Sequence, residues 1–146
     1  MKPKVLITRM LPQPALDIAL KQCNADLNRR DVRYAKKQLI RRLKGKVGMI
    51  CLLTDTIDAE VLRKSPRLKV VSNVAAGLDN IDVQAATRHG IMVTNTPGVL
   101  TETTAEFAWA LLLATARRVV EADRFVRAGK WKEWMLMGFL GRDLYG

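Results

Sequence analysis

The sequence predicts an α/β fold, a flavodoxin-like doubly wound parallel sheet, and two observations lead to it. Short continuous apolar runs recur along the chain, and segments whose apolar residues fall at helical spacing lie between them. Such runs are typical of strands that are buried on both faces. No hairpin dipeptide such as Asn-Gly or Asp-Gly joins two of the runs. Strands that alternate with helices in this way imply right-handed crossovers between parallel neighbours.

The first part of the chain alternates between strand and helix. Residues 5–7 form a short apolar strand, and Pro12 and Pro14 suit the start of a helix that ends near Lys21. Residues 25–28 form a weak strand, which we expect at the edge of the sheet. These three elements make one strand–helix–strand unit, as the fold class requires.

The basic segment that follows is predicted to be an amphipathic helix. From residue 34 to residue 44 the apolar side chains fall at helical spacing, and Gly45 ends the helix. A buried strand over residues 47–53 comes next. Either Asp58 or Thr56 then caps a short helix, because both have a side-chain oxygen that can accept from the first free N–H groups.

The candidate site follows the next apolar strand, residues 68–71. The loop Ala75-Ala76-Gly77 exposes consecutive backbone N–H groups with almost no side chain over them, so a small anion can approach closely. Asp79 and Asp82 are candidate helix caps, and His89-Gly90 ends the helix. Ligands of such sheets bind at the carboxyl ends of the strands, which here comprise residues 8–9, 53–54, 74–78 and 94–100.

A long helix is predicted from Thr103 to Gly129. Thr103 followed by Glu106 is a capping-box pattern. From residue 105 to residue 116 almost every side chain is apolar, so we expect this part to be buried all round, which one small domain cannot provide. The tail from Trp131 to Leu140 is also apolar, and it is either an interface or a loop packed on its own domain. We therefore expect a homodimer formed through this helix and tail.

Composition limits the classes of function. The chain has 49% hydrophobic and 27% charged residues, typical of a globular protein, and its 146 residues suffice for one domain with a core. We expect no signal peptide and no membrane span, because the longest apolar stretch, residues 107–114, is far shorter than roughly 20 residues. A cytoplasmic protein is the expectation. Cys23 and Cys51 are expected to be buried free thiols, and one histidine, His89, gives no basis for a metal site.

The net charge of +11 is concentrated in one segment. Between Arg29 and Lys46 nine basic residues face only Asp31. Such a face attracts polyanions, nucleic acid included. The same residues also suit the solvent side of an ordinary amphipathic helix, and apart from Tyr34 no aromatic residue lies among them. The solvated face is the better explanation.

Two runs of sequence carry a family resemblance. They read NVAAGLDNID, from residue 73, and HGIMVTNTPGVLTETTAEFAWALLLATARR, from residue 89. With these runs the chain resembles the D-isomer-specific 2-hydroxyacid dehydrogenases, in particular the glyoxylate/hydroxypyruvate reductase branch. The resemblance implies a substrate-binding (catalytic) domain over residues 1–100 and an interdomain and dimerisation helix with its tail over residues 101–146. It also implies that the chain stops before the Rossmann nucleotide-binding domain.

The resemblance implies roles for five residues. The backbone N–H groups of Ala76 and Gly77 would hold the substrate carboxylate, Leu53 and Leu100 would line the pocket, and Thr104 would lie beside the nicotinamide or its phosphates. Judged alone, four of these residues have simpler explanations. Gly77 suits a turn, Leu53 and Leu100 suit a hydrophobic core, and Thr104 suits the first turn of a helix. The family's catalytic Arg, Glu and His lie in the part expected to be missing, so no catalytic residue is expected here.

Three hypotheses about function follow. In the first, the chain is the substrate domain of an NAD(P)H-dependent 2-hydroxyacid dehydrogenase that reduces a small 2-oxo acid such as glyoxylate or hydroxypyruvate. On its own it would be inactive, and it would not bind NAD or NADP. In the second, the chain is a stand-alone dimerisation or regulatory module. In the third, it binds polyanions through the basic segment.

Overall fold

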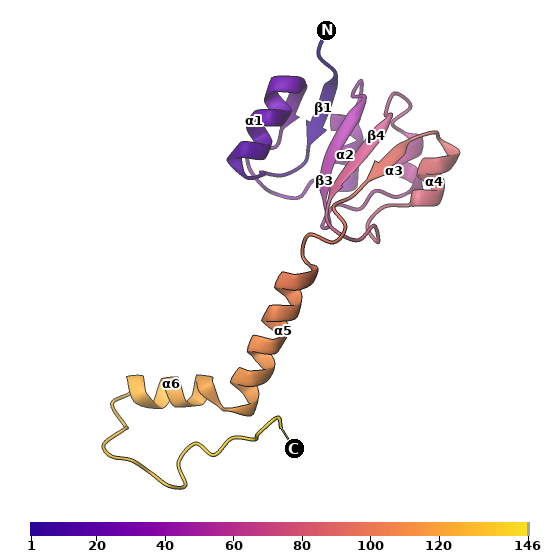
Figure 1. Cartoon of the computed structure of the whole chain (residues 1–146). Helices are drawn as coiled ribbons and strands as arrows, with labels where there is room; N and C mark the ends of the chain where they lie inside the picture. The colour runs from indigo at the N-terminus through magenta and orange to yellow at the C-terminus, as the bar shows by residue number, and fades with distance from the viewer. Residues whose placement is uncertain (146) are drawn as a thin grey trace. The chain divides into compact units, whose positions relative to one another are not determined.

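The computed structural model describes residues 1–145 and has two units, Met1–Val99 and Leu100–Gly146, of which the first is built on a sheet (Figure 1). Its strands are β1 Lys4–Ile7, β2 Asn24–Leu27, β3 Gly48–Leu52, β4 Val70–Val74 and β5 Met92–Thr94. All neighbours are parallel, in the order β2-β1-β3-β4-β5. This order is that of flavodoxin-like sheets, so the predicted fold class is confirmed, and the weak strand does lie at the edge.

Helices cover both faces of this sheet. They are α1 Gln13–Gln22, α2 Lys36–Leu43, α3 Ala59–Arg63 and α4 Val83–Arg88. Side chains of α2, α3 and α4 form one buried cluster with Leu6, Met49 and Val71 of the sheet. Leu16 of α1 is also buried but lies outside that cluster. The strand order reverses between β1 and β3, and with right-handed crossovers this reversal places α1 on the opposite face.

Local capping groups set the ends of the short helices. Asp58 accepts a hydrogen bond from the Val61 N–H at 3.1 Å, so of the two candidates it is Asp58 that caps α3. Asp82 caps α4, whereas Asp79 caps no helix. At the other end of α4, Gly90 takes a φ of 63°, the left-handed conformation that a helix stop commonly requires.

The second unit contains two helices where a single one was predicted. They are α5 Thr101–Ala116 and α6 Val119–Arg127, separated by Arg118, whose φ is 55°. The predicted helix from Thr103 to Gly129 is therefore wrong as a continuous element. The predicted capping box is wrong too, because α5 begins before Thr103 and its first turn has no side-chain cap.

The C-terminal segment, which includes residues 141–142 after the tail, meets the end of α5 at the point where the predicted helix breaks. The Arg142 N–H donates to the Ala116 carbonyl at 2.8 Å, so the tail satisfies a carbonyl at the end of α5. A Cβ atom on Gly141 would lie 2.5 Å from that same carbonyl oxygen, which only glycine avoids. Phe139 packs edge-to-face against Phe125 of α6 with ring centroids 5.1 Å apart. The tail thus packs on its own unit, and these contacts come from residues distant in sequence.

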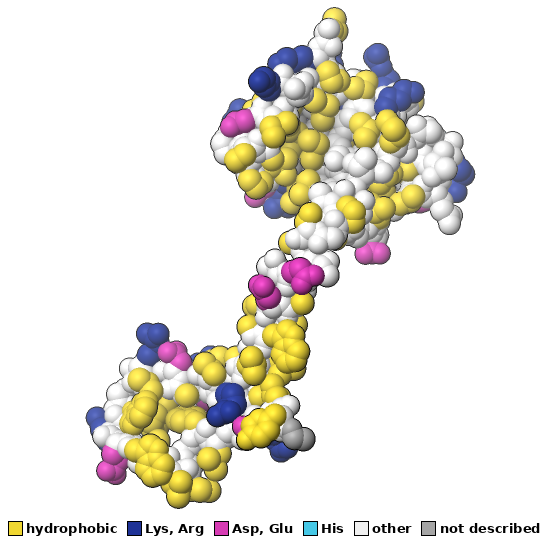
Figure 2. Space-filling model, viewed as in Figure 1, with side chains coloured by type: hydrophobic (Ala, Val, Ile, Leu, Met, Phe, Trp, Pro, Cys, Tyr) yellow, Lys and Arg dark blue, Asp and Glu magenta, His cyan; other side chains and the backbone are white. Residues whose placement is uncertain are grey.

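No side chain of α5 or α6 is buried. Figure 2 shows hydrophobic side chains along the surface of α5. Phe107, Trp109 and Leu111 of this helix are each more than half exposed. The expected burial of α5 is therefore not provided by the second unit itself. Within residues 1–145 no helix combines the length and the hydropathy needed to cross a membrane.

The caps allow a direct test of the fold. Asp82→Ala is expected to lower the free energy of unfolding by about 1 kcal/mol, because the Ala85 N–H, now 2.8 Å from the carboxylate, loses its partner. Urea denaturation followed by circular dichroism measures the change. Asp79→Ala is the matched control and should stay within about 0.5 kcal/mol of the parent chain. Equal losses in the two variants would contradict the assignment.

Candidate functional site

Two asparagine side chains tie together the carboxyl ends of β3 and β4. Asn73, at 1% exposure, donates through Nδ2 to the Gly77 carbonyl at 3.0 Å and to Asn80 Oδ1 at 2.9 Å. Asn80 donates in turn through Nδ2 to the carbonyls of Leu52 and Asp55, at 3.1 and 3.0 Å. The pair therefore joins the end of β3, the end of β4 and the loop that follows β4.

The loop after β4 has bound carbonyl groups and free N–H groups. The Ala75 carbonyl accepts from the Thr96 N–H at 2.9 Å, and the Ala76 carbonyl accepts from Asn95 Nδ2 at 2.7 Å. Across the described residues 1–145, the N–H groups of Ala76 and Gly77 donate no hydrogen bond, and both residues are exposed. Consecutive N–H donors without a protein partner suit a small anion such as a carboxylate.

A buried carboxylate supports the same edge of the sheet. Asp55 is 2% exposed, and its Oδ2 accepts from the Leu52 N–H at 3.0 Å and from the Thr8 hydroxyl. Next to Thr8, Arg9 pairs with Asp31 at 2.9 Å, and this hydrogen bond raises the pKa of Arg9 and lowers that of Asp31. Because β1 and β3 are neighbours in the sheet, the Thr8–Asp55 bond holds their carboxyl ends together, and the Arg9–Asp31 pair links the end of β1 to the segment after β2.

Three of the predicted site residues lie on this edge, and two belong to the second unit. Leu53 follows β3 directly and is 65% exposed, while Ala76 and Gly77 follow the adjacent strand β4. Leu100 precedes α5, and the Thr104 N–H in the first turn donates to its carbonyl at 2.9 Å. Both leucines are exposed, so the simpler explanation that they are core residues of their own units does not hold.

Sequence reasoning did not identify the three asparagines of the edge. Asn73 carried a usable signal, because a polar amide inside an apolar strand run needs buried partners. Asn80 and Asn95 lie in loops, where asparagine is common for turn geometry alone. Their roles depend on which strands are neighbours in the sheet, and the spacing of residues along the sequence does not determine the strand order.

The thiols add no reactive group to this edge. Cys51 is fully buried, and desolvation raises the pKa of its thiol to about 12. Its Sγ lies 3.5 Å from Asn73 Oδ1, a distance that suits a weak S–H donor. Cys23 is half-buried, which corrects the expectation that both thiols are buried. Among residues 1–145 no three His, Cys, Asp or Glu side chains gather as a metal ion would require.

The basic residues of α2 lie on its solvent side, as the amphipathic pattern predicts, and Leu39 and Leu43 are buried on the other side. Some of its charges are paired with carboxylates: Lys36 with Asp58 and Glu60, and Arg42 and Lys46 with Asp26. Four arginines line a hollow of about 450 Å³ beside α2: Arg29, Arg30, Arg41 and Arg42. Pairing neutralises part of the face, and polyanion binding stays a prediction.

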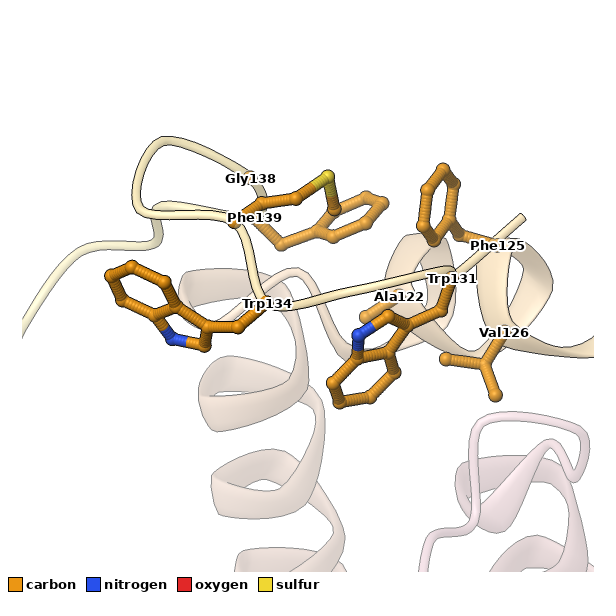
Figure 3. A pocket seen from close by; sticks show the side chains of 8 residues that line it. Ala122, Phe125, Val126, Trp131, Trp134, Gly138 and Phe139 are labelled. Carbon is orange, nitrogen blue, oxygen red and sulfur yellow. The ribbon is translucent and has the colours of Figure 1, made fainter. Parts of the chain in front are cut away.

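The second unit holds a separate apolar hollow of about 230 Å³ between α6 and the tail. Figure 3 shows Trp131, Trp134 and Phe139 of the tail around it, with Phe125 and Val126 from α6. Trp134 is 75% exposed. No charged side chain lines this hollow, which is therefore packing surface rather than a site of chemistry.

Comparison with known proteins bears on both units. The sequence model of the family described as D-isomer specific 2-hydroxyacid dehydrogenase, catalytic domain, matches residues 5–129. The glyoxylate reductase of Korarchaeum cryptofilum (strain OPF8) is 54% identical over 147 residues, which cover 100% of this chain and 44% of that protein.

Solved structures agree with the sequence comparison. The TT0316 protein of Thermus thermophilus has a TM-score of 0.89 and 45% identity, over 98% of this chain and 46% of that one. The NADPH-dependent glyoxylate/hydroxypyruvate reductase of Sinorhizobium meliloti, in complex with NADP and malonate, has a TM-score of 0.81 and 26% identity, over 100% and 44%. The chain spans less than half the length of each of these relatives.

Thiol labelling should distinguish the two cysteines. Because the thiolate is the nucleophile, the native chain at mildly alkaline pH is expected to take up maleimide at half-buried Cys23 and not at Cys51, whose pKa is raised to about 12. Peptide mass spectrometry locates the label, and unfolding in guanidinium should make both react. The Cys23→Ser variant should stay unlabelled while folded; rapid native labelling at Cys51 would contradict the burial.

Proposed function

This chain belongs to the D-isomer specific 2-hydroxyacid dehydrogenase family, and on that premise we propose that it supplies the substrate-carboxylate site of a 2-oxo acid reductase. The family is one of oxidoreductases. The proposed substrate is a small 2-oxo acid such as glyoxylate or hydroxypyruvate, as the names of the relatives suggest. The cytoplasmic location stays a prediction.

The free N–H groups of Ala76 and Gly77 are the observation that carries this proposal. A carboxylate has two oxygens and needs donors on one side, which two neighbouring N–H groups can provide without any charged side chain. Holding the carboxylate fixes the position of the 2-oxo carbon next to it, so that hydride transfer begins from a defined geometry. The role of this chain is therefore to bind and orient the substrate.

The remaining roles rest on the family resemblance. Leu53 lies beside the loop on the adjacent strand end, and its exposed apolar side chain suits a contact with the substrate. Leu100 is proposed as a second pocket residue, and Thr104 as a contact to the nicotinamide or its phosphates. These three assignments are proposals, and so is the absence of a catalytic acid or base from this chain.

The described residues do not fit a complete dinucleotide site. A dinucleotide-binding loop needs several glycines between a strand and a helix, so that the main chain can approach the pyrophosphate. The loop after β4 has one glycine, and α4 behind it has only six residues. NAD or NADP would supply the hydride in the whole enzyme, but we do not expect this chain alone to bind either cofactor.

Binding of glyoxylate tests the proposal directly. In ¹H–¹⁵N spectra of the chain, glyoxylate at millimolar concentration is expected to shift the amide signals of Ala76 and Gly77, while sodium chloride at equal ionic strength should not. Gly77→Val should weaken binding about tenfold or more, because a branched side chain would cover the donors and remove hydrogen bonds to a charged group. The backbone tolerates the change, since Gly77 has no positive φ and a Cβ there would meet only the Asp79 carboxylate, at 3.1 Å.

Thr94→Val is the matched control, because it places a valine on the same edge, at the exposed end of β5. It should bind glyoxylate like the parent chain. Absence of any shift at Ala76 and Gly77 in the parent chain would refute the proposed site. Consumption of NADH or NADPH by the pure chain with glyoxylate would refute the proposal that the chain alone is inactive.

We also propose a homodimer, formed through α5 and the tail with the corrected helix bounds. Phe107, Trp109 and Leu112 of α5 are exposed, and so are Trp134 and Met137 of the tail. Many large exposed apolar side chains on one small unit are uncommon on monomers and usually mark an interface. The alternative, a module that pairs with a longer homologous enzyme, uses the same surface and would appear as co-purification with that enzyme.

Light scattering decides between monomer and dimer. We expect a mass about twice 16.4 kDa for the chain, and a shift toward monomer when Phe107 and Trp109 are both replaced by Glu, because buried charges would oppose the contact. Lys37→Glu, a charge reversal on the exposed side of α2, is the control and should leave the mass unchanged. A monomeric parent chain at high protein concentration would contradict the proposal.

A further inference from the structure

The direction of a backbone N–H group depends on how its peptide unit is held. In a trans peptide, the C=O and N–H groups of one unit point in opposite directions. The structure has no cis peptide bond within residues 1–145. A hydrogen bond to the carbonyl of one residue therefore fixes the direction of the N–H group of the next residue.

Three consecutive carbonyls of the loop after β4 are held in this way. They accept hydrogen bonds from the Thr96 N–H (to Ala75, 2.9 Å), from Asn95 Nδ2 (to Ala76, 2.7 Å) and from Asn73 Nδ2 (to Gly77, 3.0 Å). The peptide unit between Ala76 and Gly77 is the one whose carbonyl Asn95 holds. Its N–H group is that of Gly77, which donates to no acceptor within residues 1–145.

We propose that Asn95 is a positioning residue of the substrate site, which directs the Gly77 N–H toward the substrate carboxylate by holding the Ala76 carbonyl. This inference rests on the proposed function. Asn95 is half-buried and follows β5 directly; β5 pairs with β4 up to Thr94 opposite Ser72. Its amide therefore lies beside the loop that leaves the neighbouring strand. Asn95 contacts the protein carbonyl and acts on the substrate only through it.

The two carbonyls held by residues 95 and 96 give the loop its shape. Ala75 and Ala76 both direct their C=O groups toward that segment, so the N–H groups of Ala76 and Gly77 both point away from it. Two adjacent N–H groups on one side form a concave anion site from main-chain atoms alone. Without Asn95, water would compete for the Ala76 carbonyl, and the second peptide unit could rotate.

Asn95 is also the member of this set that can be changed cleanly. Thr96 acts through its main chain, which a substitution does not remove. Asn73 is buried and bonds to Asn80 as well, so its loss would disturb the fold. The Asn95 bond is exposed to solvent, and the fold should tolerate its removal.

The test is Asn95→Ala, with glyoxylate as the probe and ¹H–¹⁵N spectra of the whole chain as the readout. Binding is expected to weaken about fivefold, the factor that one hydrogen bond of ordinary strength contributes. The glyoxylate-induced shift of the Gly77 signal should shrink, whereas that of the Ala76 signal should persist, because Thr96 still holds the preceding peptide unit. Thr94→Ala, one residue earlier at the exposed end of β5, is the control and should behave like the parent chain.

Three results would contradict the inference about Asn95. Equal affinity and an equal Gly77 shift in Asn95→Ala would overturn the inference and leave the proposed function standing. Loss of the dispersed spectrum of the first unit would show a purely structural role and would also overturn it. Absence of any glyoxylate-induced shift in the parent chain would instead refute the proposed function, and the inference with it.

Discussion

The hydrogen bond between the side chains of Asn73 and Asn80 is the contact on which the carboxyl edge of the sheet depends. The ladder between β3 and β4 ends at Leu52 opposite Val74. Main-chain pairing resumes at Ile57 opposite Ile81, where the Ile57 N–H donates to the Asn80 carbonyl at 2.8 Å. Between these two points the described residues have no main-chain hydrogen bond from one loop to the other. The amide pair replaces the ladder there, with Asn80 bound to carbonyls of the β3 side and Asn73 bound to the loop of the β4 side. A buried amide without partners costs about 1–3 kcal/mol. Here both donors of each amide are used, so the edge is stable and the loop is formed before any ligand arrives.

The two units differ in how they are stabilised. Among residues 1–145, every buried hydrophobic residue lies between Val5 and Ile91, in the first unit. The second unit has the hydrogen bond from Arg142 to Ala116 and the contact of Phe139 with Phe125, but no side chain of α5 or α6 is buried. A helix of 16 residues is only marginally stable alone in water. Burial of α5 against another surface would therefore stabilise the second unit and the assembly together.

Much of the first unit could be predicted because its causes are local. The strand at residues 5–7, the helix start at Asp58 or Thr56 and the stop at Gly90 each depend on a few neighbouring residues. The structure confirms the strand and the stop, and of the two cap candidates it selects Asp58. The break at Arg118 could not be predicted from the local pattern, because the contacts found beside it involve Gly141 and Arg142, which are distant in sequence. The same distinction holds for the site. The loop around Gly77 was identified from its small residues, but the role of Asn95 depends on strand order and register.

A site built from main-chain donors separates two tasks that side chains often combine. Under the proposed function, the N–H groups of Ala76 and Gly77 would bind the carboxylate of any 2-oxo acid, because that group is common to the whole class of substrates. Substitution of the donor residues changes the donors little, unless a side chain covers them as a valine at position 77 would.

Selection among 2-oxo acids must then come from side chains that contact the rest of the substrate. On the described edge of the sheet, Leu53 is the residue proposed for this task, because it is exposed and follows the strand next to the loop. An apolar residue there distinguishes substrates by the size of their apolar part, and such contacts discriminate weakly, by about 1–3 kcal/mol for each methylene. Affinity for the carboxylate and selectivity for the acid are thus properties of different parts of this edge.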